Sequence, residues 1–151
     1  MRHGRVAKKF GRSKSHREML MASLVTNLIL RSRIKTTLAK AKQARRDAEK
    51  MVTLARKGTL ASRRLAAARL RRPLAVQHLF DQVVPAFTGR PGGYTRVVKT
   101  HRRRGDGAEM AILECVASVP PAVVDPIPRK AAEDIGKPEE KKDEKAVAAK
   151  A

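Results

Sequence analysis

The chain has 151 residues, enough for one domain of ordinary size with an appendage. Its 35 Lys and Arg outnumber 14 Asp and Glu, and the formal net charge of +21 excludes most ordinary metabolic enzymes. Such a charge indicates a polyanionic partner, nucleic acid first. A single cysteine, Cys115, excludes a disulfide framework, and no apolar run reaches the roughly 18 residues that span a bilayer. The charged N-terminus lacks the apolar core of a signal peptide, so we expect a cytoplasmic protein.

The excess positive charge lies in the first 117 residues. Residues 1–117 hold 28 Lys and Arg against seven acids, whereas residues 118–151 hold seven of each. The latter segment carries five of the eight prolines and no Phe, Tyr or Leu, so it buries too little apolar surface to offset the entropy of ordering. We therefore predict a basic arm at residues 1–14, a compact domain at 15–117 and a largely disordered tail at 118–151.

The domain begins with a predicted helix, strand and helix. Ser15 and Glu18 form a capping-box pattern, after which an apolar stripe at helical spacing continues to about Arg31. The β-branched run 33–37 predicts a short strand. Thr37 then suits the N-cap of a second helix from residue 38 to about 57, with Gly58 at its C-terminal cap.

Two more helices are expected before the pattern changes. The third spans about residues 60–70 and packs Leu65, Ala66 and Leu70 inward. Pro73 suits the first turn of the fourth helix, and Pro85 is expected to stop it.

The chain then changes to a strand-like pattern. The runs 94–101 and 110–116 are β-like, and the Gly-Asp-Gly sequence at 105–107 predicts a hairpin connection. Because a lone hairpin is marginally stable, the early strand should pair with it. The predicted fold class is α+β, with about four helices and a small three-stranded sheet made of one early strand and a C-terminal hairpin.

Several blocks of sequence, taken in order, resemble one known family. They are Met-Arg-His at 1–3, Phe-Gly-Arg-Ser at 10–13, His-Arg at 16–17, the run 33–42 with Arg45-Arg46, the run 63–69, Gly-Gly-Tyr-Thr-Arg at 92–96 and Arg-Gly-Asp-Gly-Ala at 104–108. Together they closely resemble ribosomal protein seventeen of the bacterial large subunit, over about residues 1–117. The tail from Ser118 extends beyond the compact core of that family.

The resemblance implies a non-catalytic protein of the large ribosomal subunit. It implies binding to large-subunit ribosomal RNA, stabilisation of the folded RNA, and a position near the outer rim of the polypeptide exit tunnel beside other large-subunit proteins. The protein is then expected to be ribosome-bound in the cytoplasm, with no cofactor, metal, membrane or small-molecule substrate.

The candidate RNA contacts are mostly Arg and Lys, which neutralise phosphates and release counterions; Arg can also hold a phosphate with two bonds or stack on a base. In and next to the arm they are Arg2, His3, Arg5, Lys8, Lys9, Arg12, Lys14, His16 and Arg17. In the domain they are Lys35, Arg45, Arg46, Arg63, Arg64, Arg69, Tyr94, Arg96, Lys99, Arg102, Arg103 and Arg104.

Some of these residues could have a structural role instead of contacting RNA. The helical arginines could form a solvated face, and Tyr94, which could stack on RNA, could instead belong to the core. Phe10 could stack on a base or pack under the first helix. Recognition is expected to depend on RNA shape and backbone contacts, with few base-specific ones.

Other function classes fit the sequence less well. The four histidines are scattered without a metal-binding pattern, and Cys115 is expected to be a buried structural thiol. The main alternative is a basic DNA-binding nucleoid or regulatory protein, which would need a recognition helix or a dimeric heptad seam, and we find neither. A membrane-surface protein would need an amphipathic helix with aromatic anchors, which are also missing.

Overall fold

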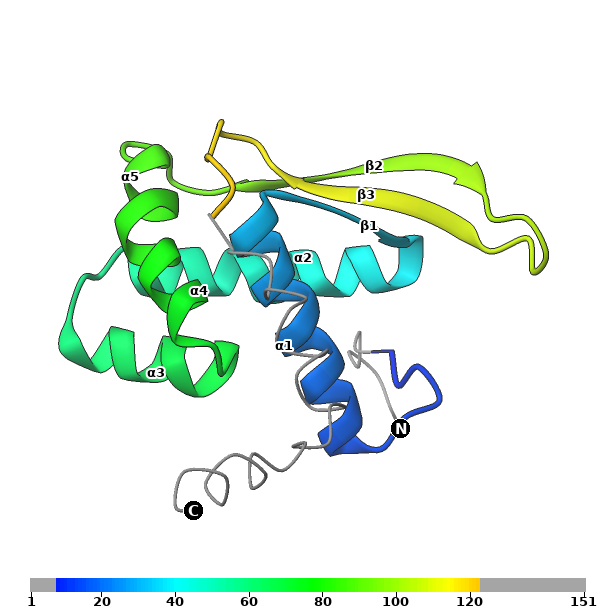
Figure 1. Ribbon diagram of the computed structural model, residues 1–151, viewed down its shortest axis with the longest axis horizontal. Coiled ribbons are helices and arrows are strands. Elements are labelled where there is room, and N and C mark those ends of the chain that lie inside the picture. The colour runs from blue at the N-terminus through cyan, green and yellow to red at the C-terminus, as the bar shows by residue number, and fades with distance from the viewer. Residues whose placement is uncertain (1–7, 123–151) are drawn as a thin grey trace, which may run out of the picture.

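Helices cover one face of a three-stranded antiparallel sheet in the computed structural model, which describes residues 8–122 (Figure 1). The elements are α1 (Lys14–Arg31), β1 (Arg33–Thr37), α2 (Leu38–Ala55), α3 (Leu60–Leu70), α4 (Pro73–His78), a π-helical turn η1 (Leu79–Val83), α5 (Val84–Ala86), β2 (Thr95–Arg102) and β3 (Glu109–Cys115). The predicted α+β class with one early strand and a C-terminal hairpin is confirmed. The arm was predicted at residues 1–14 and the tail at 118–151, and of these the positions 1–7 and 123–151 lie outside the described residues.

The hairpin strand β3 lies in the middle of the sheet, in the order β1-β3-β2. Ile34 pairs with Leu113, and Leu113 pairs with Val97 on the other side. Because side chains alternate across a strand, Leu113 and Ala111 point to the same face, where both are fully buried toward α2. On the opposite face, the exposed Arg33 and Lys35 leave the sheet open to solvent.

Helix α1 begins two residues earlier than the predicted capping box. Ser13, rather than Ser15, is the N-cap: its hydroxyl accepts a hydrogen bond from the backbone N–H of His16 at 3.4 Å. The reason is the turn before it, where Phe10 and Gly11 both have positive φ and Phe10 packs against the core. That contact sets where the chain enters the helix, so Ser13 reaches the cap position first. It also favours the packing alternative for Phe10 over base stacking.

Helix α2 packs closely through small residues. Ala41, Ala44 and Ala48 are buried on its inner face, so the helix backbone lies near both the sheet and α1. Thr37 precedes the helix as predicted, although its side chain makes no capping hydrogen bond. The helix ends at Ala55, slightly before the predicted end, and Gly58 adopts a φ of +66° just beyond it.

Helix α3 has the predicted bounds, and Ala66 and Leu70 are buried as predicted, but Leu65 is not. Its buried residues are Ser62, Ala66 and Leu70, spaced by one helical turn, and the side-chain hydroxyl of Thr26 on α1 donates to the Leu70 carbonyl at 3.1 Å. Leu65, which we expected inside, is 57% exposed. Helical spacing was right, but neighbouring Ala66 faces α1 and α2 because a small residue permits close packing there.

The fourth helix does not stop at Pro85 as expected. It continues through η1 into α5, and Pro85 lies inside the last turn. In η1 the Val84 N–H donates to the Leu79 carbonyl, five residues back. This wider turn relieves the clash that the Pro85 ring would otherwise make with the carbonyl of Asp81, four residues earlier.

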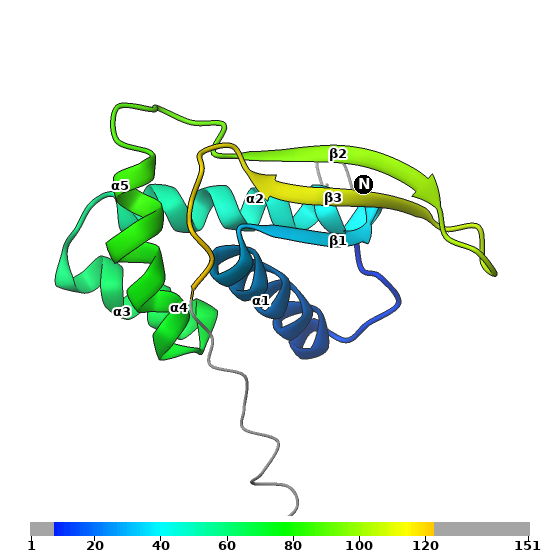
Figure 2. The ribbon, with the colours of Figure 1, turned by 45° about the horizontal axis from the view of Figure 1, so that its top comes forward.

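The compact fold continues past Ala117, the predicted end of the domain. Val119 is only 5% exposed, and its carbonyl accepts a hydrogen bond from the Ser32 hydroxyl at 2.8 Å. The Ala122 N–H donates to the Leu30 carbonyl at 2.7 Å. Figure 2 shows this stretch running between α1 and the α4–α5 helices. Residues 118–122 thus belong to the packed structure.

We therefore expect a chain that ends at Ala117 to be less stable than one that ends at Ala122. The shorter chain loses the burial of Val119 and two hydrogen bonds, a cost of roughly 2–4 kcal/mol in the free energy of unfolding. Urea unfolding of both truncated chains and the full chain measures this. Equal stability of all three would contradict the assignment of residues 118–122 to the fold.

Candidate nucleic-acid interface

The sequence-predicted contact residues lie on three surfaces. Arg2, His3 and Arg5 are outside the described residues. The arm end carries Lys8, Lys9, Arg12, Lys14, His16 and Arg17; the sheet and hairpin carry Lys35, Tyr94, Arg96, Lys99, Arg102, Arg103 and Arg104; helices α2 and α3 carry Arg45, Arg46, Arg63, Arg64 and Arg69. Nearly all of the described side chains are exposed, and the exceptions are considered below.

On the open face of the sheet, two arginines share one carboxylate. The register places Arg33 and Arg96 on either side of Glu114. Arg96 approaches Glu114 at 2.7 Å through Nη2, and Arg33 approaches it at 3.5 Å through Nε. Lys35, two residues from Arg33, points to the same face. These residues place three positive charges and one negative charge on the face, which therefore keeps a positive excess. Sequence reasoning omitted Arg33, although strand alternation with Lys35 could have identified it.

One arginine of the hairpin loop is held by an ion pair within the loop, and two others are exposed to solvent. Arg103 forms a bidentate ion pair with Asp106, whose other contact is the Ala108 N–H at 3.2 Å. The hydrogen bonds from Arg103 and Ala108 lower the pKa of Asp106 to about 2. Arg102 and Arg104 are exposed and have no acidic partner within residues 8–122. The hairpin extends beyond the helices (Figure 1), so these two guanidinium groups lie at a projecting tip.

The helical arginines differ in what they contact. Arg45 pairs with Glu49 one turn along α2, at 3.1 Å, and Arg63 stacks over the Phe80 ring at 4.5 Å from its centroid. Arg46, Arg64 and Arg69 are exposed and form no ion pair within residues 8–122. Part of this surface is therefore engaged internally, and part is available to a partner.

Near the arm, Arg12 is partly internal. It is half-buried, and its Nη1 donates to the Phe10 carbonyl at 3.0 Å, which holds the turn before α1. Lys8, Lys9, Lys14 and His16 are exposed, and Arg17 is half-buried. The positive groups that precede and open α1 are thus mostly at the surface.

Tyr94 belongs to the core, which corrects its assignment as an RNA-stacking residue. Its side chain is 1% exposed, and its ring meets that of Phe87 edge-on, with centroids 5.1 Å apart. The Tyr94 hydroxyl accepts a hydrogen bond from Arg56 at 2.8 Å, and Arg56 also donates to the Arg90 carbonyl at 2.9 Å. Tyr94 therefore has no free ring face, and Arg56, which sequence reasoning left aside, has a structural role.

Most cations of the described chain lack an intramolecular acid. Residues 8–122 contain 26 Lys and Arg but seven Asp and Glu. Four arginines form ion pairs there, with Glu49, Asp106 and Glu114 as partners, which leaves 22 basic side chains without one. Such a surface attracts a dense array of negative charge.

This excess charge should also limit the stability of the free protein. Raising NaCl from low to physiological concentration screens repulsion between the cations, so we expect the melting temperature to rise by several degrees. A variant in which the exposed Arg46, Arg64 and Arg69 become Gln should show a smaller rise. Differential scanning fluorimetry measures both, and a melting temperature that falls with salt would show that repulsion is not limiting.

Cys115 lies at the end of β3, partly buried. Burial, with a smaller contribution from Glu114, raises the pKa of its thiol from 9.0 to about 11. A raised thiol pKa favours the folded state below pH 9, and this contribution is lost as the pH rises through 11. The residue thus has the environment of a structural thiol rather than of an activated nucleophile.

We expect Cys115 to react slowly with a thiol reagent at pH 8. A pKa two units higher lowers the thiolate fraction about 100-fold relative to the unfolded chain. Labelling with iodoacetamide in buffer and in urea, followed by mass spectrometry, measures the ratio of rates. Similar rates in both solutions would contradict this burial.

The part of the chain at residues 8–122 contains no group of three or more His, Cys, Asp and Glu side chains that could hold a metal ion. None of its helices has the length and apolar character needed to cross a membrane.

Comparison with known proteins identifies the family. The sequence model of the family described as Ribosomal protein L17 matches residues 20–116. The chain belongs to the ribosomal protein L17 family. It is similar to the large ribosomal subunit protein bL17 of Thermomicrobium roseum, with 50% identity over 117 residues, covering 78% of this chain and 100% of that protein. Similar matches are the bL17 proteins of Acidobacterium capsulatum (46% identity; 78% of this chain, 74% of that protein) and Fusobacterium nucleatum (45%; 77% and 100%).

Membership of the L17 family has three consequences. It makes the chain a structural, non-catalytic protein of the large ribosomal subunit, and it confirms the resemblance seen in the sequence. It also favours the ribosomal interpretation over a DNA-binding regulator. The Thermomicrobium roseum protein is fully covered by an alignment that spans 78% of this chain, so the remaining part has no counterpart in it.

Proposed function

We propose that this L17-family chain binds large-subunit ribosomal RNA through Arg and Lys contacts and stabilises its folded arrangement. The observation that carries the proposal is the set of 22 basic side chains that have no acidic partner within residues 8–122. Most of them are spread over the arm end, the open sheet face with the hairpin, and the outer sides of α2 and α3. A protein with cations on several sides can neutralise several RNA segments at once.

The mechanism follows from the repulsion between phosphates. RNA helices that pack together must bring their backbones close, and interposed Lys and Arg offset this repulsion while releasing counterions. Arg102 and Arg104 at the hairpin tip suit contact with phosphates at a distance from the body, because the Arg103–Asp106 pair holds the turn that carries them. Most of these contacts are to RNA shape and backbone, because exposed Arg and Lys side chains bind phosphates whatever the base sequence.

The family resemblance also supports a position for the protein in the subunit. We place the protein at the outer rim of the polypeptide exit tunnel, beside other large-subunit proteins, on ribosomes in the cytoplasm. Chemical cross-linking of intact particles tests this position, because neighbours and nascent chains at the rim would be captured. Cross-links only to proteins remote from the tunnel would contradict it.

Sedimentation tests the proposal as a whole. Tagged full-length protein should migrate with large subunits through moderate salt, and release with nucleoid DNA would contradict the proposed function.

The variant Arg102→Gln/Arg104→Gln should reduce protection of the RNA in hydroxyl-radical footprints at the hairpin contact. Lys141→Gln/Lys142→Gln is the matched control, because it removes the same charge from a segment that is neutral as a whole. Equal footprints of both variants would show that the hairpin does not contact the RNA.

A further inference from the structure

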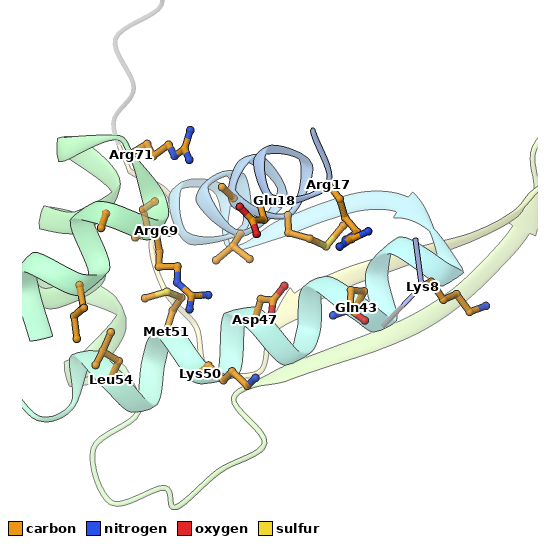
Figure 3. A pocket seen from close by; sticks show the side chains of 16 residues that line it. Lys8, Arg17, Glu18, Gln43, Asp47, Lys50, Met51, Leu54, Arg69 and Arg71 are labelled. Atoms are coloured by element: carbon orange, nitrogen blue, oxygen red, sulfur yellow. The ribbon is translucent and has the colours of Figure 1, made fainter. Parts of the chain in front are cut away.

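A groove between α1, α2 and α3 has a chemistry that phosphate neutralisation alone does not explain. It has a volume of about 780 Å³, within the range of roughly 300–1,000 Å³ that is common for small-ligand pockets. The three helices converge around it, with α1 and α2 as its long walls and α3 at one end (Figure 3). Sequence analysis assigned Lys8, Arg17 and Arg69 to RNA contact but gave no reason for them to lie together.

The floor of the groove is apolar. Met21 and Val25 of α1, Met51 and Leu54 of α2, and Leu65 of α3 line it. Leu65 is the residue that we expected inside the core and that is instead 57% exposed, at the edge of this groove. Met21 and Met51 are themselves only 7% and 6% exposed, so the apolar surface that a flat group would cover is mainly that of Leu65, with the two buried methionines beside it.

The rim of the groove is cationic. Lys8, Arg17, Lys50, Arg69 and Arg71 line it, and none of them forms an ion pair within residues 8–122. Arg69 reaches from α3 toward Met51 across one end of the groove (Figure 3). Five cations around an apolar floor suit a ligand with negative charges on its outside and an apolar surface within.

The groove also contains hydrogen-bonding groups. Gln43 and Asp47 of α2, both half-buried, and the exposed Glu18 of α1 line it. Asp47 is half-buried and has no ion pair or hydrogen bond to its carboxylate within residues 8–122. Burial raises its pKa, and Lys50, Arg69 and Arg46 oppose that shift. A carboxylate and an amide in this setting can accept hydrogen bonds from the amino and imino groups of a nucleobase.

We propose that this groove binds an unpaired nucleotide of RNA, with its base on the Met21–Met51–Leu65 floor and its flanking phosphates on the cationic rim. The inference rests on the proposed function, since it names one RNA element that the protein holds. Gln43 and Asp47 contact the edge of the base. An acidic protein segment is a poorer occupant, because Asp47 in the groove and Glu18 at its edge repel its carboxylates, whereas a base presents no negative charge to them.

Methionine methyl NMR of the full-length protein tests the inference. The chain has five methionines, of which Met21 and Met51 line the groove and Met110 lies on β3, outside it. Single-stranded hexanucleotides of adenylate, cytidylate and uridylate should shift the Met21 and Met51 signals and leave Met110 unchanged. A short RNA duplex, whose bases stay stacked, should bind without shifting Met21 or Met51.

A matched pair of variants on α3 checks the site by affinity. Leu65→Glu places a carboxylate at the groove, whereas Leu60→Glu makes the same change on the same helix at a residue that does not line it. Both leucines are exposed, at 57% and 64%, so both variants should fold. Leu65→Glu should weaken single-stranded RNA binding roughly tenfold and Leu60→Glu at most a few-fold, while duplex binding is equal for both.

The outcomes separate this inference from the proposed function. If single-stranded and duplex RNA both bind while Met21 and Met51 stay unchanged, the groove is not a nucleotide site although the protein binds RNA. If an acidic amphipathic peptide shifts these methyl groups and RNA does not, the groove is a protein-docking site and the inference is wrong. If neither RNA binds and the chain does not sediment with large subunits, the proposed function fails as well.

Discussion

Deleting residues 2–9 should lower the affinity for large-subunit RNA by roughly 10- to 100-fold and make its salt dependence shallower. The deletion removes Arg2, Arg5, Lys8 and Lys9, four positive charges. Each charge that neutralises a phosphate contributes about 0.7–0.9 to the slope of log affinity against log salt, so the slope should fall by about three. Filter binding at several salt concentrations measures both quantities.

The structure sets where this deletion should end. Phe10 packs against the core and Ser13 caps α1, so a deletion that extends to Lys14 would also remove a contact and a cap worth about 1 kcal/mol. A deletion to Lys9 leaves both in place, and circular dichroism should not change. A chain that ends at Ala122 is the control, because residues 123–151 carry seven basic and seven acidic side chains. An unaltered salt slope in the arm deletion would show that the arm does not contact RNA.

Replacing Tyr94 by Ala should lower the free energy of unfolding by roughly 3–5 kcal/mol. The side chain is buried, its ring packs edge-on against Phe87, and its hydroxyl accepts a hydrogen bond from Arg56. Removing it opens a cavity and leaves the guanidinium of Arg56 without one of its two acceptors. Urea unfolding monitored by circular dichroism measures the loss.

A second substitution distinguishes a core role from base stacking. Tyr94→Leu removes the ring but keeps much of the apolar volume, so the loss of stability should be smaller than for Tyr94→Ala. The RNA affinity of the folded protein, measured at low temperature, should be unchanged. A loss of RNA affinity without a loss of folding stability would show that Tyr94 contacts RNA.

The local pattern of the chain predicted most elements of the fold. The β-branched run before Thr37 is β1, with the expected bounds, and the strands of the hairpin differ by one residue at the ends. These segments could be predicted from the sequence because strand periodicity, turn glycines and the need to pair the hairpin all favour the same arrangement. Helix starts at Leu38, Leu60 and Pro73 were equally clear, since a cap residue or a proline precedes or opens each one.

The errors have tertiary causes. The local pattern favours Ser15, which has Glu18 three residues later, and the packing of Phe10 is what makes Ser13 the N-cap instead. Leu65 and Ala66 are adjacent on α3, and the closeness of α1 and α2 selects the smaller one for the core. Pro85 would end an ordinary α-helix, but the π-helical turn before it changes the hydrogen-bond register. Each depends on contacts between distant segments.

The sequence predicted the positive charge of the candidate interface, but it predicted less of how the side chains are arranged. Composition indicated a polyanionic partner, and the turn glycines indicated an exposed basic loop at Arg102 and Arg104. The sharing of Glu114 by two strands follows from sheet register, which sequence alone does not fix. The groove combines residues from three helices and the arm end, so its basic rim and apolar floor became visible only with the packed structure.

The central position of β3 has a consequence for how the protein is made. A chain is synthesised from its N-terminus, yet the middle strand of this sheet, Glu109–Cys115, is the last of its three strands to be produced. More than 70 residues are synthesised between β1 and the strand with which it pairs. Until then the alanine face of α2 has no sheet to cover it. Long-range pairing of this kind folds slowly and exposes strand edges meanwhile. An incomplete chain that stops before residue 109 therefore cannot form any of the sheet, and the basic arm emerges long before the fold that anchors it.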